Sequence, residues 1–233
     1  MTIDLLVSRF LSELNIHGLP ESWFGPELVL SQANDISDLS KSSLVDKRSE
    51  LSFLELEKEA SECELCSLCQ NRKSVVFGDG TIESPLIAFV GEGPGADEDL
   101  QGLPFVGKAG ELLNNAIEKG LGLKRKDIYI CNVVKCRPPE NRTPLPNEVQ
   151  ACSPYLYRQL ELIKPKVIVT LGQTAQQAIS AKEIGITKLR GQWQEWRGFS
   201  VMPTYHPAYI LRKPEAKKPF WEDLKEVMKF LGI

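Results

Sequence analysis

The stretch that most constrains this chain runs from Leu86 to Leu113 and reads LIAFVGEGPGADEDLQGLPFVGKAGELL. Its first five residues, 86–90, form a continuous apolar run, which is typical of a buried strand. Gly91, Gly93 and Gly95 follow at once, and a group of carboxylates comes next. A buried strand that leads into such a loop predicts a ligand site at the carboxyl end of that strand.

Two phosphate-binding interpretations of this loop meet physical objections. The spacing at 91–96 fits the dinucleotide pattern GxGxxA, but Pro94 interrupts it and the carboxylates at 97–99 would repel a pyrophosphate. The segment 102–108 nearly forms a P-loop, but Ala109 stands where a hydroxyl must reach magnesium. The carboxylates and a nearby aromatic ring suit a neutral planar ligand better than a phosphate.

Strands and helices alternate along the rest of the chain. Further apolar runs predict strands at 128–134, 167–171 and 201–205. Helices are expected at 108–120, at 173–182 and from Pro219 onward. Strands separated by helical segments favour a parallel sheet with helices on both faces.

The first part of the chain differs in composition from the rest. Residues 2–14 place apolar side chains at helical spacing, and the Ser-rich stretch 31–43 is the best linker in the chain. We place a domain boundary near residue 44. The extension 1–43, with helical character, has no assigned function, and 44–233 is the main domain, opening with a charged helix that runs to Glu62.

Charge and hydropathy narrow the classes of function. The net charge of −3 divides into −7 over residues 1–62 and +4 over the remainder, which permits an anionic partner without requiring one. No stretch approaches the length of a membrane-spanning helix, and Asp4 stands where a signal peptide would be basic. We expect a cytoplasmic, intracellular protein that does not bind membranes.

The chain contains six cysteines, which in an intracellular protein indicate metal binding or reactivity more than disulfides. Cys63 and Cys66 form a CxxC at an expected helix end, where two thiolates can reach one ion. Cys136 and Cys152 are the remaining candidates, and Cys69 could replace Cys66. The spacing allows a four-cysteine site and does not choose iron–sulfur over zinc.

Polar side chains follow the second and fourth predicted strands. The loop KCRPPENR, at 135–142, is stiffened by two prolines and carries basic groups that could hold phosphate oxygens or simply be solvated. His206 opens HPAYILR and suits either a structural hydrogen bond or catalysis. The carboxyl ends of parallel strands open on one side, so Glu92, Asn132, Asn141 and His206 should meet there.

Three blocks of sequence, taken in order, resemble the motifs of one family. They are GEGPGADEDLQGLPFVGKAG at 91–110, NVVKCRPPENRTP at 132–144 and HPAYILR at 206–212, preceded by CELC at 63–66. Over about residues 63–231 the chain is similar to the family 4 uracil-DNA glycosylases, the iron–sulfur branch of that superfamily. The resemblance implies a three-layer α/β/α sandwich around a mostly parallel four-stranded sheet.

The resemblance also implies a cofactor and a mode of turnover. Cys63, Cys66, Cys136 and Cys152 would bind a structural 4Fe–4S cluster, whereas Cys69 stands where the family requires no ligand. A related branch attaches covalently to DNA through a histidine in the loop after the second strand. The corresponding loop here contains no histidine, so ordinary turnover is expected.

Roles at the active site follow from the same resemblance. The implied catalytic residues are Glu92, His206, Glu98 and Asn141, and the implied base-binding residues are Gly93, Phe105 and Asn132. The aromatic ring would stack on a flipped base, while the Asn132 amide would pair with uracil and reject cytosine. His206 would donate from a neutral ring to the charge growing at O2. The carboxylates, or Asn141, would position water and stabilise the cationic sugar.

The resemblance further implies contacts with DNA. Arg137, Arg142 and Arg212 would hold phosphates, while Ile210 and Leu211 would wedge into the space left by the base. We expect a monomeric, monofunctional enzyme of base excision repair that acts on uracil in single- or double-stranded DNA. Two alternatives stay open: a glycosylase for other deaminated bases such as hypoxanthine, and a non-catalytic DNA-binding iron–sulfur module.

Overall fold

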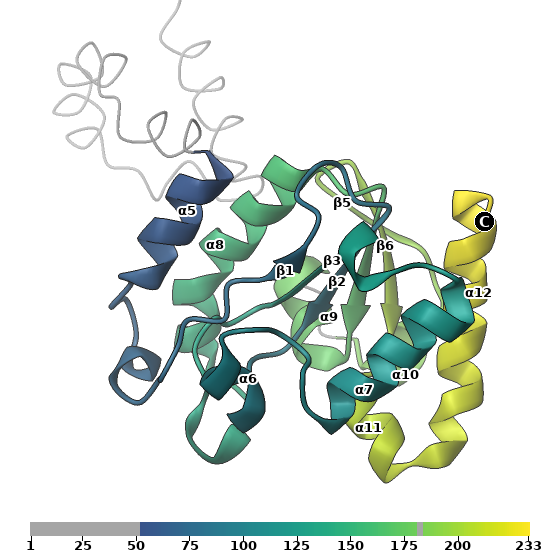
Figure 1. Ribbon diagram of the computed structural model, residues 1–233. Helices are drawn as coiled ribbons and strands as arrows, with labels where there is room; N and C mark the ends of the chain where they lie inside the picture. Colours follow the sequence, from purple (N-terminus) through teal and green to yellow (C-terminus); the bar gives the residue numbers. More distant parts are fainter. Residues whose placement is uncertain (1–51, 181–183) are drawn as a thin grey trace, which may run out of the picture. The chain divides into compact units, whose positions relative to one another are not determined.

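The computed structural model describes residues 52–180 and 184–233 (Figure 1). The predicted extension, 1–43, with its helix and its linker, lies outside the described residues, as does the first part of the charged helix predicted over 44–62. The described part of that helix is α5, Phe53–Ser61. No helix among the described residues is long and apolar enough to cross a membrane.

A six-stranded sheet organises the described residues, in the order β1-β3-β2-β4-β6-β5. The strands are β1 Asp79–Gly80, β2 Ile87–Gly91, β3 Tyr129–Asn132, β4 Val167–Leu171, β5 Gln194–Trp196 and β6 Phe199–Thr204. β2 pairs in parallel with β3 and β4, and β4 pairs in parallel with β6. The predicted four-stranded parallel centre is therefore confirmed, and β1 and β5 extend it as antiparallel edges.

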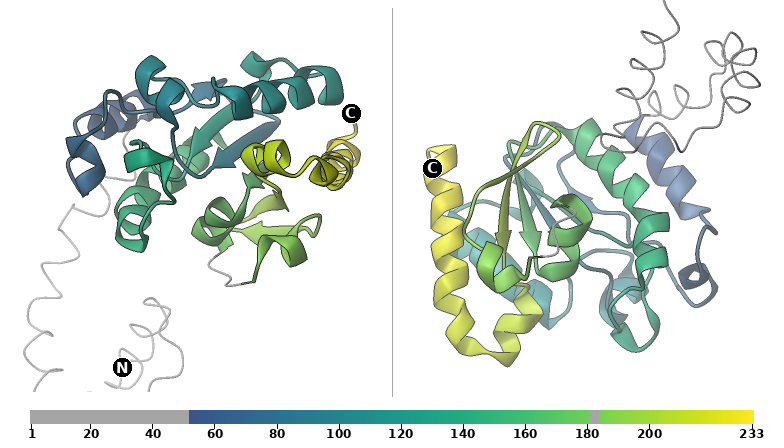
Figure 2. Two further views of the ribbon diagram at one scale, coloured as in Figure 1. Left: turned by 90° about the horizontal axis from the view of Figure 1, so that it is seen from below. Right: turned by 180° about the vertical axis from the view of Figure 1, so that it is seen from behind.

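Helices cover both faces of this sheet (Figures 1 and 2). The α-helices after α5 are α6 Ala96–Gln101, α7 Lys108–Asn115, α8 Pro146–Ile163, α9 Gln173–Ser180, α10 Ile186–Leu189, α11 Pro207–Arg212 and α12 Lys217–Leu231. Shorter 3-10 segments are η2 Ser67–Gln70, η4 Arg125–Asp127, η5 Pro139–Asn141 and η6 Pro214–Ala216, and a π-helical turn, η3 Ala116–Leu121, extends α7.

The alternation of side chains along β2 divides the interior into two cores. Ala88 and Val90 pack with residues of α5, α8 and α9. Ile87 and Phe89 pack on the opposite face with residues of α7, α11 and α12. Because successive side chains of a strand point to opposite faces, the fully buried strand builds both cores, and the predicted three-layer arrangement is confirmed.

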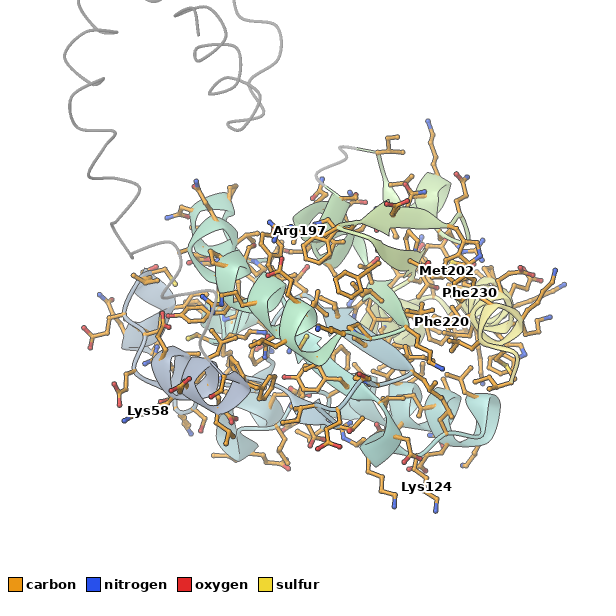
Figure 3. The ribbon with its side chains drawn as sticks, turned by 90° about the horizontal axis from the view of Figure 1, so that it is seen from above. Lys58, Lys124, Arg197, Met202, Phe220 and Phe230 are labelled. Carbon is orange, nitrogen blue, oxygen red and sulfur yellow. The ribbon has the colours of Figure 1, made fainter. Side chains whose placement is uncertain are left out.

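The helix α12 and the turn between β5 and β6 pack against the outer part of the sheet. Figure 3 shows Met202 of β6 near Phe220 of α12, and both are buried in the second core. Arg197, in the turn, places its guanidinium carbon 5.0 Å from the centroids of the Tyr157 and Trp196 rings. These contacts cover the faces of the sheet and leave the carboxyl ends of its parallel strands to form the site.

Candidate active site and cysteine pocket

The carboxyl ends of the four parallel strands lie along one edge of the sheet. Gly91, the last residue of β2, is opposite Asn132, the last residue of β3. Leu171, at the end of β4, is opposite Thr204, at the end of β6. The loops that follow these ends carry the predicted site residues, as expected for an open α/β sheet.

Asn132 presents an unsatisfied oxygen at this edge. The residue is 1% exposed, and its Oδ1 has no hydrogen-bond partner in the described structure. A Cβ atom on Gly91 would lie 2.4 Å from that oxygen and 2.6 Å from the Phe105 ring. Buried polar atoms are nearly always paired in folded proteins, so this oxygen indicates a ligand group that donates a hydrogen bond beside an aromatic ring.

The Phe105 loop is held in a strained conformation. Phe105 has a φ of +53° and is 5% exposed, and a left-handed backbone is uncommon for a bulky residue. Arg125 fixes this loop, because its Nη2 donates to the Pro104 carbonyl at 2.5 Å and its Nε pairs with Asp79 at 2.7 Å. Arg125 could not be predicted from the sequence, since nothing local links it to a loop 20 residues away.

Glu98 also shapes this loop. Its carboxylate accepts hydrogen bonds from the N–H groups of Gly95, Val106 and Gly107, at 3.1, 2.9 and 3.0 Å. The predicted role in water positioning does not fit this placement, because both carboxylate oxygens are already engaged by the main chain. Glu98 instead joins the start of α6 to the residues that follow Phe105.

His206 is held as a neutral side chain in a defined tautomer. It is the N-cap of α11, and its Nδ1 accepts from the Ala208 N–H at 3.1 Å. Burial lowers its pKa to about 4, and the positive charge of Arg212 acts in the same direction. At neutral pH the proton is therefore on Nε2, and the ring lies with its centroid 5.7 Å from that of Phe105.

Glu92 lies at the start of the Gly-rich loop and is oriented by a residue that the sequence analysis missed. The Thr174 hydroxyl, at the beginning of α9, donates to the Glu92 carboxylate. The main chain of Glu92 is fixed as well, because its carbonyl accepts from the Val134 N–H at 3.1 Å. Beside it, a Cβ on Gly93 would lie 2.7 Å from Val134 Cγ2, so a larger residue would displace the loop.

The basic loop after β3 divides into exposed and engaged side chains. Arg137 Nε donates to Asn141 Oδ1 at 2.7 Å, at an exposed position. Arg142 forms a fork with the fully buried carboxylate of Glu148, at 2.8 and 2.7 Å. Lys135, the first residue of this loop, is only 2% exposed. Its buried ammonium cannot reach a DNA backbone, so the loop's phosphate candidates are the two arginines.

The predicted wedge on α11 is only half accessible. Leu211 is 49% exposed, whereas Ile210 is 3% exposed and packs in the core shared by α7 and α12. Ile210 therefore does not fit the predicted role in DNA intercalation. Arg212, which follows on α11, is exposed and stands in the last turn of that helix.

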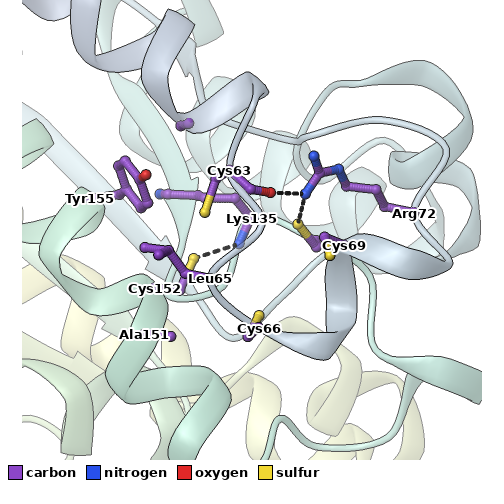
Figure 4. A pocket seen from close by; sticks show the side chains of 11 residues that line it. Cys63, Leu65, Cys66, Cys69, Arg72, Lys135, Ala151, Cys152 and Tyr155 are labelled. Atoms are coloured by element: carbon purple, nitrogen blue, oxygen red, sulfur yellow. Dashed lines mark hydrogen bonds between the residues drawn. The ribbon is translucent and has the colours of Figure 1, made fainter.

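Five cysteines line one cavity: Cys63, Cys66, Cys69, Cys136 and Cys152. They come from the segment after α5, from η2, from the loop after β3 and from α8, and Figure 4 shows the labelled sulfur atoms facing a common space. Arg72 Nη1 donates to Cys136 Sγ at 3.4 Å, and the Lys135 N–H donates to Cys152 Sγ at 3.3 Å.

Burial disfavours the thiolate form of three of the cysteines that line this cavity. Burial raises the pKa values of Cys66 and Cys136, and it raises that of Cys152 to about 12. Among the described residues, no three His, Cys, Asp or Glu side chains form a set that could hold one metal ion. Thiols spread around a cavity fit a group larger than a single ion, which would displace their protons on binding.

Comparison with known proteins identifies the class to which this fold and strand-end site belong. The sequence model of the uracil DNA glycosylase superfamily matches residues 77–225, more than half of the chain, so the chain belongs to this superfamily. The match contains the whole strand-end site from Glu92 to His206.

Relatives assign the chain to one branch of the superfamily. A type-4 uracil-DNA glycosylase of Thermotoga maritima is 47% identical over 73% of this chain and 90% of its own length. Those of Saccharolobus solfataricus and Sulfurisphaera tokodaii are 43% and 45% identical over 75% and 76% of this chain and 84% and 83% of their own lengths. The chain is therefore a member of the type-4 branch, and the predicted family is confirmed.

Proposed function

We propose that this protein removes uracil from DNA by hydrolysing the bond between C1′ and N1, which leaves an abasic site for base excision repair. The observation that supports this most strongly is the buried, unpartnered Oδ1 of Asn132 beside the ring of Phe105. Membership of the type-4 branch supports the same substrate, because the relatives carry the name uracil-DNA glycosylase.

Base recognition depends on the amide of Asn132. Its Oδ1 accepts from N3–H of uracil and its amide N–H donates to O4, while Phe105 stacks on the ring. Cytosine offers an acceptor at N3 and a donor at C4, so both pairings fail, and each mispaired buried group costs about 1–3 kcal/mol. The base reaches this pocket by flipping, which costs a few kcal/mol and least for single-stranded or mismatched sites.

Bond cleavage separates charge between base and sugar. The C1′–N1 electron pair leaves with uracil, and the neutral ring of His206 donates from Nε2 to the charge that develops at O2. Glu92, oriented by Thr174, stabilises the cationic sugar and positions the water that adds to C1′. Glu98 supports this geometry by holding the main chain around Phe105.

DNA binding uses the exposed groups near the pocket. Arg137, oriented by Asn141, and Arg212 hold phosphates, and Leu211 fills the space left by the flipped base. Arg142 contributes less, because Glu148 already neutralises it. We propose that the substrate is uracil-containing DNA, single- or double-stranded, and that the enzyme acts as a monomer.

The cysteine cavity holds the cofactor in this proposal. Cys63, Cys66, Cys136 and Cys152 would hold a 4Fe–4S cluster, and Cys69 lines the same cavity as a fifth thiol. When bound, the cluster would supply a structural cross-link between the segment after α5, the loop after β3 and α8. The fit is supported by the number of thiols around the cavity and by the two cations, Arg72 and Lys135, that line it.

Release of base from matched oligonucleotides tests the proposed function. Four duplexes that differ only in one base, uracil, cytosine, thymine or hypoxanthine, are incubated with iron-replete protein, and abasic sites are counted as alkali-labile breaks. Breaks at uracil alone support the proposal. Breaks at hypoxanthine would indicate a wider glycosylase, and no breaks would indicate a DNA-binding module.

A further inference from the structure

Lys135 is a buried cation that lies between the two sites. Its side chain is 2% exposed, and its ammonium donates to the Asn132 carbonyl at 2.8 Å and to the Gln159 side-chain oxygen. The ammonium also lies 5.6 Å from the centroid of the Phe77 ring. Over residues 52–180 and 184–233, no carboxylate forms an ion pair with it.

The second acceptor of the Lys135 ammonium, the Gln159 side chain, is itself held in place by hydrogen bonds. Gln159, on α8, uses its amide N–H groups to bind the Phe77 carbonyl at 2.9 Å and the Tyr129 hydroxyl at 2.8 Å. The side-chain oxygen that accepts from the Lys135 ammonium is therefore held by the contacts of its amide with Phe77 and Tyr129. A network in which the polar groups are paired has a unique geometry, so Lys135 holds the main chain of Asn132 in one place.

The opposite side of Lys135 faces the cysteine cavity. The main-chain N–H of Lys135 donates to Cys152 Sγ at 3.3 Å, and the next residue in the chain is Cys136. Among the described residues that line this cavity, the charged side chains are Lys135 and Arg72 (Figure 4). A group bound by four thiolates carries negative charge, and a buried cation is tolerated when such a charge is close.

We propose that Lys135 is a positioning residue that couples the two sites: it balances the negative charge of the thiolate-bound group and supports the main chain of Asn132, which reads the base. This inference rests on the proposed function. It predicts that changes at Lys135 affect both the group in the cysteine cavity and the preference for uracil, although Lys135 contacts neither DNA nor base.

The test compares Lys135→Met with Arg72→Met and with Lys126→Met. Arg72 is the other cation at the cavity, and its guanidinium hydrogen-bonds to Ser61, Cys63 and Cys136 among the described residues. Lys126 is an exposed lysine and serves as the control. All full-length proteins are purified without oxygen, and iron, sulfide, reduction potential and melting temperature are measured.

The decisive readout is binding to DNA that cannot be cleaved. Matched duplexes carry a 2′-fluoroarabino uridine or cytidine, whose fluorine destabilises the cationic sugar, and the ratio of the two affinities gives the uracil preference. We expect Lys135→Met and Arg72→Met to lower the reduction potential, because each removes a positive charge beside the cluster. We expect only Lys135→Met to reduce the uracil preference, by about tenfold, with cytidine binding unchanged.

Two outcomes would overturn the inference. One is an iron-replete Lys135→Met protein that keeps the uracil preference of the natural chain. The other is an Arg72→Met protein that loses as much of the uracil preference as Lys135→Met does. If Lys135→Met takes up no iron, Lys135→Arg is measured in its place, because arginine keeps the charge but displaces the main chain of Asn132. We expect Lys135→Arg to retain iron and to lose uracil preference. An unchanged uracil preference in Lys135→Arg would reject the coupling. A natural protein without any uracil preference would instead reject the proposed function.

Discussion

Removal of the His206 side chain should slow glycosidic cleavage without preventing DNA binding. The Nδ1 atom is occupied by the Ala208 N–H, so Nε2–H is the donor available to the base. The loss of one preorganised donor raises the barrier by about 2–4 kcal/mol, or roughly 30- to 900-fold in rate. His206→Ala should show this loss in single-turnover base release with enzyme in excess, where product release does not limit the rate.

A second variant separates catalysis from helix capping. His206 is the N-cap of α11, and His206→Ser keeps a side-chain acceptor for the Ala208 N–H while it removes the donor to the base. We expect His206→Ser to melt close to the natural protein and to be as slow as His206→Ala. A natural rate in His206→Ser would show that the residue only caps the helix and would refute the mechanism.

The pH dependence gives an independent check on His206. The pKa falls from 6.5 to about 4 on folding, so the unfolded chain binds the proton more tightly and stability declines as pH falls from 6.5 toward 4. The full shift corresponds to about 3 kcal/mol, of which about 2 kcal/mol is lost between pH 7 and pH 4.5. Chemical denaturation at pH 7 and pH 4.5 should show this decline in the natural protein and a smaller one in His206→Ser. An equal decline in both proteins would contradict a buried neutral ring.

Three further changes test other parts of the site. Glu98→Gln weakens three main-chain contacts, so melting temperature and base-release rate should fall together; a slower enzyme of unchanged stability would restore a direct catalytic role. Leu211→Ala should slow base release from duplex DNA more than from single-stranded DNA, and an equal effect of Leu211→Ala on both substrates would reject its role as a wedge. Ile210→Ala should instead lower the free energy of unfolding by about 2–5 kcal/mol, because the Ile210 side chain is buried. Cys63→Ser should lower iron per chain while Cys69→Ser leaves it unchanged, as measured by iron analysis, and the reverse result would exchange their roles.

The parallel centre of the fold was predictable because fully buried strands are continuous apolar runs. β2 and β4 match the predicted runs within one residue at each end. The edges β1 and β5 contain two and three residues and have no periodicity to detect. The 18-residue helix α8 was not predicted either, because Pro154 interrupts it and buried polar side chains break its apolar stripe.

The candidate site was predictable where the position of a residue relative to a strand end determines its place. Asn132 ends β3 and His206 follows the end of β6, and strand order alone brings them to one edge. Glu98 could not be distinguished from a catalytic carboxylate, because its partners at 106 and 107 are determined by the fold. The burial of Lys135 could not be predicted either, because a basic sequence does not reveal that a lysine is buried behind the strand.

The most direct test of the account compares the natural protein with Asn132→Asp in base release from the uracil and cytosine duplexes. If the Asn132 amide reads the base, the natural protein releases only uracil. Asn132→Asp should then lose about 1–3 kcal/mol of its discrimination, since a carboxylate cannot donate to O4. If the iron-replete natural protein released no uracil, or if Asn132→Asp cut uracil at the natural rate and still rejected cytosine, the buried amide would not read the base and the account would be wrong.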